Sequence, residues 1–341
     1  PIIWSTLIMS LSISTIITMA SHHWMLAWLG LELNTLSILP ITMKLGHPRA
    51  TEATVKYFLI QALAAALILF ASTMNAWQTG LWDITNSTQT TIITMAILMK
   101  LGTAPVHLWY PEVLQGTTLT TALLISTWQK LAPLSLLYMM HTNLPNNLLL
   151  LTGLLSALLG GWAGLNQTQS RKIMAHSSIA HMGWILIALS MTPELTTLTL
   201  LTYMIMTTAM FSSLNTSTTK TITDMGTAWS SSPMTMTLTL LTLTSLGGLP
   251  PLTGFLPKLL ILNELTMKSL LPMAMMLALA SLPSLFFYIR MAYTTTLTTP
   301  PTTTNIEHKW RFKATPPPTY TATTATALLL MPLSPALHTT T

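Results

Sequence analysis

Four ionisable residues stand inside long hydrophobic stretches of this sequence, and their side chains are the ones best suited to chemistry: Glu32, Lys100, Lys130 and Lys258. Placing an ionisable group at the centre of a bilayer costs at least ~2.5–3.5 kcal/mol on insertion scales. Carboxylates and amines take up and release protons, so a chain that keeps such groups at this cost is expected to use them. We therefore interpret them as a pathway for protons or ions through a helical membrane protein.

The sequence suggests a charge pair between Glu32 and Lys100. Both residues lie near the middle of a hydrophobic stretch, where an unpaired carboxyl group would be driven toward its neutral form. Lys130 has no acidic residue in its own stretch, and an apolar environment favours the uncharged amine, which can exchange a proton. The alternatives are a static ion pair, or lysines that extend to the membrane surface, as Lys56 and Lys268 are placed to do.

Three histidines are auxiliary candidates for the same pathway. His107 follows a motif of glycine and proline, and His176 and His181 have the spacing i, i+5, which turns them to different faces of a helix. The favoured interpretation of each is a structural histidine held by hydrogen bonds, with a part in proton relay as the alternative.

The composition identifies the class of protein. Hydrophobic residues make up 50% and charged residues 6% of the 341 residues, and the mean hydropathy is +0.58, so the charges are too few to solvate a globular surface. The 14 basic residues are scattered and form no patch with aromatics, so nucleic acid is not expected as a partner. The absence of cysteine excludes disulfides, thiolate zinc sites and cysteine-ligated iron–sulfur clusters.

Hydrophobic runs of about 20 residues predict an all-α polytopic membrane protein with eleven transmembrane helices in a single membrane domain over residues 1–341. The runs are Ile2 to Ala20, Trp24 to Met43, Tyr57 to Trp77, Thr91 to Trp109, Thr117 to Met140, Leu148 to Leu165, Ile173 to Met191, Leu195 to Asn215, Met234 to Leu265, Leu270 to Tyr293 and Tyr320 to Leu337. Most connections are short, so consecutive helices should be antiparallel neighbours.

The basic residues then segregate by side of the membrane. With eleven crossings, only Lys268 falls on one side, and the other side receives Lys44, Arg49, Lys56, Arg171, Lys172, Lys220, Arg290, Lys309, Arg311 and Lys313. By the positive-inside rule, the N-terminus and the basic loops should face the cytoplasm or its mitochondrial equivalent, the matrix. Residues 294–319 should form a matrix-side loop, and a final helix at residues 320–337 should carry the C-terminus to the intermembrane space.

Two of the predicted helices should be broken near mid-membrane. The motif M-K-L-G-T-A-P runs from Met99 to Pro105, and L-G-G-L-P-P-L-T-G-F-L-P-K runs from Leu246 to Lys258. Proline removes a backbone donor, glycine lowers helix propensity, and non-helical backbone at this depth is tolerated only inside protein or beside a cavity. The broken helices are five helices apart, which predicts an inverted repeat of two five-helix units, residues 1–140 and 148–293. Plain proline kinks are the alternative.

Four segments resemble the antiporter-like membrane subunits of respiratory complex I. They are Gly30 to Pro40, Met99 to Val113, Asn166 to Trp184 and Gly247 to Lys258, and they occur in the family's order. The resemblance covers essentially the whole chain. It implies eleven helices, as in animal members of the family, and a central hydrophilic axis. That axis pairs Glu32 with Lys100 and continues through Lys130 to Lys258.

The resemblance also implies a proton-translocating subunit of NADH:ubiquinone oxidoreductase in the inner mitochondrial membrane. Its partners would be other membrane subunits and lipids, with cardiolipin as a candidate. NADH, FMN, iron–sulfur clusters and ubiquinone would be bound by other subunits, so no cofactor or metal is expected on this chain. Two alternatives stay open. One is a structural membrane subunit without its own proton path, and the other is a stand-alone sodium/proton antiporter, which would need an acidic cation site where only Glu32 is available.

Overall fold

Helices make up this chain in the computed structural model, which describes residues 2–43, 46–80, 82, 87–297 and 318–329. Within these residues there is no β-strand, and one isolated bridge pairs Gln169 with Thr221. Seven helices in the described part of the chain are long and apolar enough to cross a membrane: α1 (Ile2–Ala20), α2 (Trp24–Thr42), α3 (Pro48–Thr79), α8 (Asn146–Gly164), α9 (Ser170–Met191), α10 (Pro193–Ser217) and α14 (Leu271–Leu297). The predicted all-α polytopic membrane fold is therefore confirmed.

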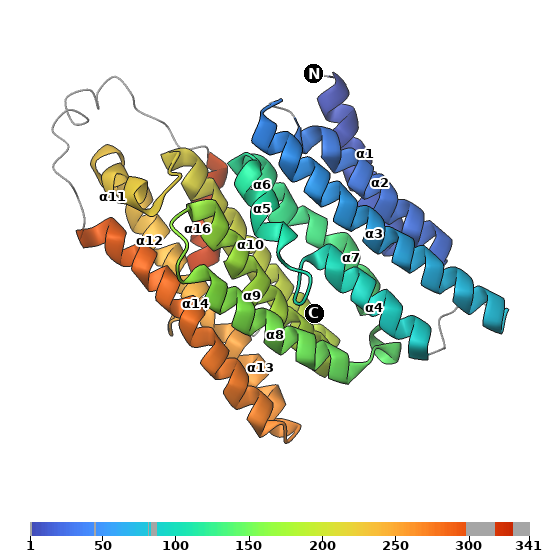
Figure 1. Ribbon diagram of the computed structural model, residues 1–341. Helices are drawn as coiled ribbons and strands as arrows, with labels where there is room; N and C mark the ends of the chain where they lie inside the picture. Colours follow the sequence, from blue (N-terminus) through green and yellow to red (C-terminus); the bar gives the residue numbers. More distant parts are fainter. Residues whose placement is uncertain (1, 44–45, 81, 83–86, 298–317, 330–341) are drawn as a thin grey trace. The chain divides into compact units, whose positions relative to one another are not determined.

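The chain divides into two compact units, residues 1–155 and 156–341. The shorter helices of the first unit are α4 (Ser87–Leu101), α5 (Trp109–Gly116), α6 (Leu119–Ser126), α7 (Trp128–Met139) and the 3₁₀ turn η1 (His141–Asn143). In this unit α3 packs against α2, α4 and α5, while α7 packs against α1, α2 and α4 (Figure 1). Helices α2, α3, α4 and α7 are therefore neighbours, and they carry most of the polar side chains of the unit's interior.

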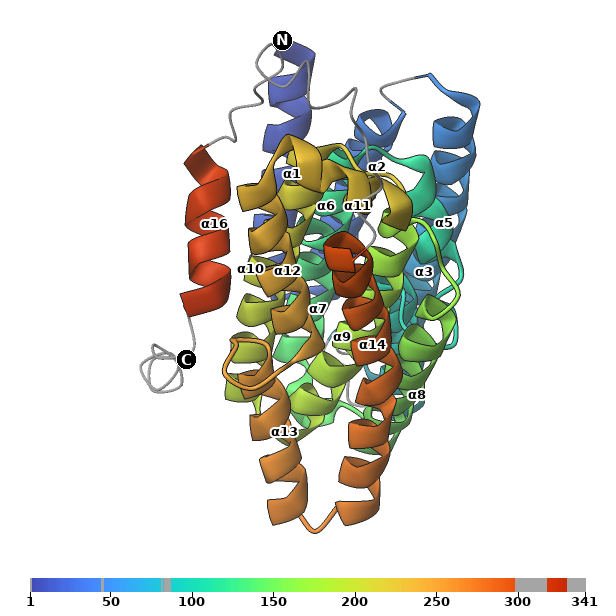
Figure 2. The ribbon, with the colours of Figure 1, turned by 90° about the vertical axis from the view of Figure 1, so that its left-hand side faces the viewer.

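In the second unit α10 packs against α9, α12, α13 and α16. The shorter helices of this unit are α11 (Ile222–Ser231), α12 (Pro233–Gly247), α13 (Phe255–Met267) and α16 (Pro318–Leu329). Helix α14 packs against α11, α12 and α13, and the last of these runs beside it to a short connection (Figure 2).

Both predicted helix breaks are present. Helix α4 ends at Leu101 and α12 ends at Gly247, and each is followed by a glycine in the left-handed region, Gly102 with φ 71° and Gly248 with φ 81°. In each break the glycine N–H bonds to the carbonyl three residues earlier, and the next N–H bonds to the carbonyl five residues earlier, at 2.9–3.3 Å. This is the Schellman arrangement, which only glycine adopts without steric cost. Helix resumes at α5 and at α13.

A third interruption was missed by the sequence analysis. The predicted span at residues 117–140 is divided at Thr127, whose φ of −112° and ψ of −72° separate α6 from α7. The N–H and hydroxyl of Thr127 both donate to the carbonyl of Leu123, as does the hydroxyl of Ser126. Hydroxyl groups that bond back to an earlier carbonyl compete with the helix ladder and bend it. Lys130 therefore lies in the first turn of α7 and not at the middle of a continuous helix.

Helix α11 was also missed, because residues 216–233 were expected to form a connection. Thr221 and Asp224 form a capping box, with reciprocal side-chain to backbone hydrogen bonds. Burial raises the pKa of the Asp224 carboxyl, but hydrogen bonds from Thr221 and Lys220 outweigh burial and leave this pKa below its ordinary value. The Thr-x-x-Asp spacing is a helix-start signal that could have located α11.

Among the described residues of the second unit, Arg171, Lys172, Lys220 and Arg290 lie at the end of this unit where α9 begins. Arg290 donates to the carbonyls of Leu165 and Gln167, just before α9 begins, and Ser170 N–H donates to the carbonyl of Lys220 at 3.1 Å. At the other end of α9, Lys268 Nζ donates to the carbonyl of Met191 at 2.7 Å. Lys268 therefore lies at the opposite end of α9 from the other basic residues described outside the helix interiors of this unit, while their side of the membrane stays a prediction.

Several predictions lie wholly or partly outside the described residues. These are most of the matrix-side loop at residues 294–319, the part of the C-terminal helix beyond Leu329, and the basic residues Lys44, Lys309, Arg311 and Lys313.

Replacing Gly160 by alanine is expected to separate α8 from α9. A Cβ atom there would lie 2.6 Å from the backbone nitrogen of Ala180, which cannot move without shifting α9. Overpacking of this kind costs about 1–3 kcal/mol, so thermal unfolding of the purified assembly should begin at a lower temperature. Gly161→Ala is the matched control in the same helix, because its nearest neighbour would be 3.2 Å away. Equal losses in the two variants would contradict the predicted contact.

Candidate functional site

Two of the predicted residues, Lys100 and Lys130, line one cavity in the first unit. The cavity has about 360 Å³ of empty space, including the solvent at its mouth, and can hold at least one water molecule. Its walls are Leu31, Asn34, Thr35, Tyr57, Gln61, Lys100, Leu101, Trp109, Tyr110, Ile125, Gln129, Lys130 and Pro133. Non-helical backbone near Thr127 and after Leu101 therefore lies beside a polar cavity, as the physical chemistry of a membrane interior requires.

Lys100 reaches the cavity from the last turn of α4. Its residue is 6% exposed, and its Nζ has no hydrogen-bond partner among the described residues. The break after Leu101 leaves carbonyl groups at the end of α4 without helical partners, and these groups favour a nearby cation. Gln61 Nε2 supplies one replacement donor, at 3.3 Å from the carbonyl of Lys100 itself. The site thus offers a buried amine beside a partly negative helix end.

Lys130 reaches the same cavity from α7 and is 3% exposed. Its Nζ lies 5.0 Å from the centre of the Tyr110 ring, within the range of a cation–π interaction. Trp109 stands edge-on to Tyr110 and to Tyr57, with ring centres 5.5 and 5.7 Å apart. Aromatic side chains therefore form the wall against which Lys130 lies.

Glu32 is not part of the cavity wall. Helix α2 reaches the cavity through Leu31, Asn34 and Thr35, and Asn34 is turned about 200° around the helix from Glu32. No N–O contact within 4.0 Å joins Glu32 to Lys100 among the described residues, although their charges lie close enough to attract. The direct charge pair suggested by the sequence is therefore not formed here. Glu32 Oε2 is buried without a hydrogen-bond partner in the described part of the chain.

Three polar residues of the cavity wall were missed by the sequence analysis. Gln129 Nε2 donates to Asn34 Oδ1 at 3.0 Å, and Tyr57 OH donates to Gln129 Oε1 at 3.3 Å. All three side chains are buried. The sequence offered one signal for each: Gln129 is next to Lys130, Asn34 is two residues after Glu32, and Tyr57 follows Lys56.

Lys258 lines a separate cavity within the second unit, with about 300 Å³ of empty space. Its Nζ donates to the carbonyl of Gly247 at 2.9 Å, and so occupies the carbonyl end of α12 at the second break. It also lies 5.9 Å from the centre of the Trp184 ring. The other residues of the wall are His181, Ile185, Thr199, Thr202, Tyr203, Met206, Gly254, Pro257 and Ile261.

Among the three histidines, the structure brings His181 together with Lys258. Both line the second cavity, and His181 Nε2 lies 3.4 Å from the hydroxyl of Tyr288. His176 is buried against the neighbouring helix and does not line that cavity. His107 is buried in the first break, where its Nδ1 lies 3.2 Å from the carbonyl of Pro105.

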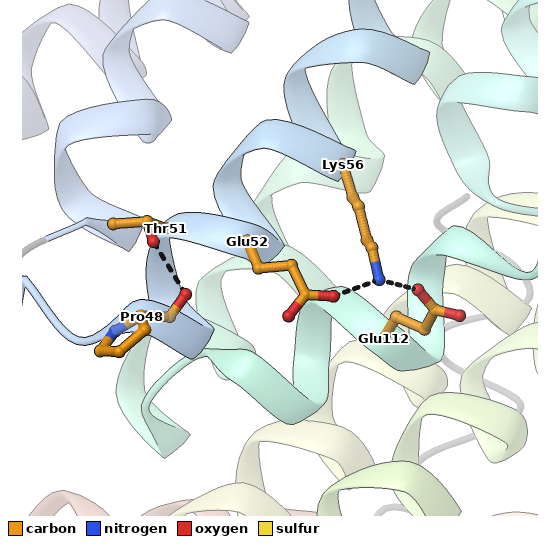
Figure 3. Close-up of polar contacts among 5 residues, drawn as sticks. All are labelled: Pro48, Thr51, Glu52, Lys56 and Glu112. Carbon is orange, nitrogen blue, oxygen red and sulfur yellow. Dashed lines mark hydrogen bonds and ion pairs between the residues drawn. The ribbon is translucent and has the colours of Figure 1, made fainter.

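Lys56 does not simply extend to a membrane surface, as the sequence suggested. Its Nζ forms ion pairs with Glu52 Oε1 and Glu112 Oε2, each at 2.6 Å (Figure 3). These side chains are roughly half exposed, and exposed pairs contribute about 0.2–1 kcal/mol. Glu112 stands in the first turn of α5, so the contact holds the half-helix after the first break against α3.

No group of three or more His, Asp or Glu among the described residues could hold a metal ion.

This bundle of apolar helices, with two helices interrupted beside lysines, has an antiporter-like membrane fold. Solved structures of this class have the same fold. Respiratory complex I from Thermus thermophilus with bound aureothin matches with a TM-score of 0.84 and 25% identity, over 97% of this chain and 77% of that chain. The Mrp complex from Dietzia sp. DQ12-45-1b matches with a TM-score of 0.82 and 15% identity, over 97% of this chain and 75% of that one.

Sequence comparison specifies the family. The profile described as NADH:quinone oxidoreductase/Mrp antiporter, TM matches residues 21–284, and the NADH dehydrogenase subunit 2 C-terminus matches residues 285–338. NADH-ubiquinone oxidoreductase chain 2 of Carassius auratus is 52% identical over 100% of this chain and 99% of that relative. The Tetraodon nigroviridis chain of the same name is 50% identical over 99% of this chain and 98% of that relative. The chain belongs to the NADH-ubiquinone oxidoreductase chain 2 family.

Replacing Lys258 by methionine is expected to leave the enclosed carbonyl of Gly247 without its donor. An unsatisfied buried acceptor costs about 1–3 kcal/mol, so the apparent unfolding temperature of the purified assembly should fall. Lys268→Met is the matched control, because Lys268 also donates to a helix-end carbonyl but in an exposed position, where water replaces it. The prediction fails if the two substitutions lower the unfolding temperature equally.

Proposed function

We propose that this chain is a proton-translocating membrane subunit of an NADH:ubiquinone oxidoreductase, located in the inner mitochondrial membrane. The observation that supports this most directly is the cavity that two buried lysines share in the first unit. Amines in such a place can bind and release protons carried by water. The absence of cysteine fits a chain that moves protons while electron transfer takes place on other subunits.

The proposed relay uses Glu32, Lys100 and Lys130 in the first unit. Two ammonium groups in one cavity repel each other, so a proton on Lys100 disfavours a proton on Lys130. A movement of Glu32 toward Lys100 would hold the charge on Lys100 and drive the proton from Lys130. A movement away would allow Lys130 to take up a proton again. The relay therefore converts a displacement of α2 into a change of protonation.

In the second unit the proposed relay residue is Lys258, with His181 as its auxiliary partner. Lys258 is held by a helix-end carbonyl that favours its charged form, and His181 lines the same cavity. We assign no relay role to His107 or His176, because neither lines either of these cavities. Each proton moved against the membrane potential requires about 2.3 kcal/mol per 100 mV, which the redox reaction must supply.

The proposed topology has eleven spans in an inverted repeat. The seven long helices would be joined by the broken pairs α4/α5 and α12/α13, by the bent pair α6/α7 and by α16. The matching Schellman endings of α4 and α12 support the equivalence of the two breaks. The basic end of the second unit would face the matrix, with the N-terminus on that side and the C-terminus in the intermembrane space. Other membrane subunits and lipids would surround the chain.

Replacing Lys130 by methionine separates the proton-translocating function from a purely structural one. The apolar substitute fits a buried position, so the complex should assemble, while the protons pumped per NADH should fall by roughly tenfold or more, as expected when a proton-transfer group is lost. Pumping by purified complex in sealed vesicles, together with NADH oxidation, measures this. Lys268→Met is the control, because Lys268 lines neither cavity.

Two outcomes would contradict the proposal. Assembled Lys130→Met complex with unchanged pumping would indicate a structural subunit. Sodium-dependent proton exchange by the chain reconstituted alone, without NADH oxidation, would indicate a stand-alone antiporter.

A further inference from the structure

We propose that Gln129 is a positioning residue that couples α2, the helix of Glu32, to Lys130 through its hydrogen bonds to Asn34 and Tyr57. The inference rests on the proposed proton-translocating function. In it, the neutral amide of Gln129 transmits a displacement of α2 to Lys130. Because an amide does not titrate, Gln129 can hold this position without competing for the proton.

The amide of Gln129 is the point at which three helices meet. It donates to Asn34 Oδ1 on α2 at 3.0 Å and accepts from Tyr57 OH on α3 at 3.3 Å, while its own backbone belongs to α7. Gln129 is 9% exposed, Asn34 3% and Tyr57 2%, so bulk solvent does not reach these bonds. Breaking one of them would leave a buried polar group unsatisfied, which makes the bridge costly to open.

The hydrogen bond between Asn34 and Gln129 connects α2 to the residue next to Lys130. Glu32 does not line the cavity, whereas Asn34, two residues later on the same helix, does so and bonds to Gln129. Gln129 is adjacent to Lys130 in the sequence. Any shift of α2 that follows a change at Glu32 must therefore either carry the first turn of α7 with it or break a buried hydrogen bond.

The backbone around Gln129 is able to follow such a shift. The helix is interrupted at Thr127, and Lys130 N–H reaches the carbonyl of Thr127 at 3.3 Å instead of completing a continuous helical ladder. Pro133 has no N–H with which to bond the carbonyl of Gln129. With the backbone ladder weakened on both sides, the side chain of Gln129 makes a larger contribution to the position of Lys130 on the Tyr110 ring.

The test begins with Gln129→Leu, which keeps the size of the side chain and removes both hydrogen bonds. In assembled complex in sealed vesicles, the rate of coupled proton pumping should fall roughly three- to tenfold, the factor expected from losing one or two neutral hydrogen bonds. Gln89→Leu is the matched control. Gln89 is also buried and bonds to Thr88 and Gln78, but it does not line the cavity. Its pumping should match that of the unaltered chain.

Exchange of the two amides tests positioning against a general loss of packing. Asn34→Gln and Gln129→Asn each change the length of the bridge and should each lower pumping, while the double variant N34Q/Q129N restores the total length and should restore pumping. Because Asn34 and Gln129 are in contact, losses that stay additive in the double variant would show that the bond between them does not matter for pumping. This comparison also tests the role of Gln129 if the complex with Gln129→Leu fails to assemble.

A cycle with Glu32 tests the direction of coupling. If Gln129 transmits the effect of Glu32, then adding Gln129→Leu to Glu32→Gln should lower pumping no further than the stronger single variant. Normal pumping in Gln129→Leu, or no restoration in the exchanged pair, overturns the inference. Lys130→Met reports on the proposed function separately: if that variant loses pumping while Gln129→Leu keeps it, only the role of Gln129 is wrong.

Discussion

The constraint on which the rest of this structure depends is the need to satisfy the backbone of interrupted helices inside an apolar bundle. Each break exposes carbonyl groups that water cannot satisfy inside an apolar bundle. At the second break Lys258 donates directly to the carbonyl of Gly247, and at the first break Lys100 stands in the last turn of the half-helix itself. At the second break the helix end and the lysine therefore stabilise each other, because the ammonium group donates to a carbonyl that has no helical partner.

The two breaks share a backbone and differ in their charges. Ten residues after each left-handed glycine stands an ionisable residue, Glu112 after Gly102 and Lys258 after Gly248. Glu112 is about half exposed and paired with Lys56, whereas Lys258 lines a cavity. The same helix ending with a left-handed glycine thus precedes a surface ion pair in the first unit and a candidate relay residue in the second.

A helical membrane protein that both binds protons and transfers them needs helices whose position can change. The first cavity supplies them, because α7 begins at an interruption and its first turn is tied to neighbouring helices by side chains. Hydroxyl groups of Ser126 and Thr127 produce this interruption at a place without glycine. The chain therefore combines two breaks at glycine with one bend at Ser126 and Thr127, and Lys130 lies just after the bend.

The sequence by itself determined the class of protein, the two glycine and proline breaks and the buried lysines, because hydropathy and the special backbone of these residues are local properties. Only the tertiary structure decided which side chains face one another. It placed Asn34 and not Glu32 at the cavity, selected His181 from three histidines, and gave Lys56 two partners. Helical rotation and the approach of distant segments set these contacts, and neither is encoded in the type of a single residue.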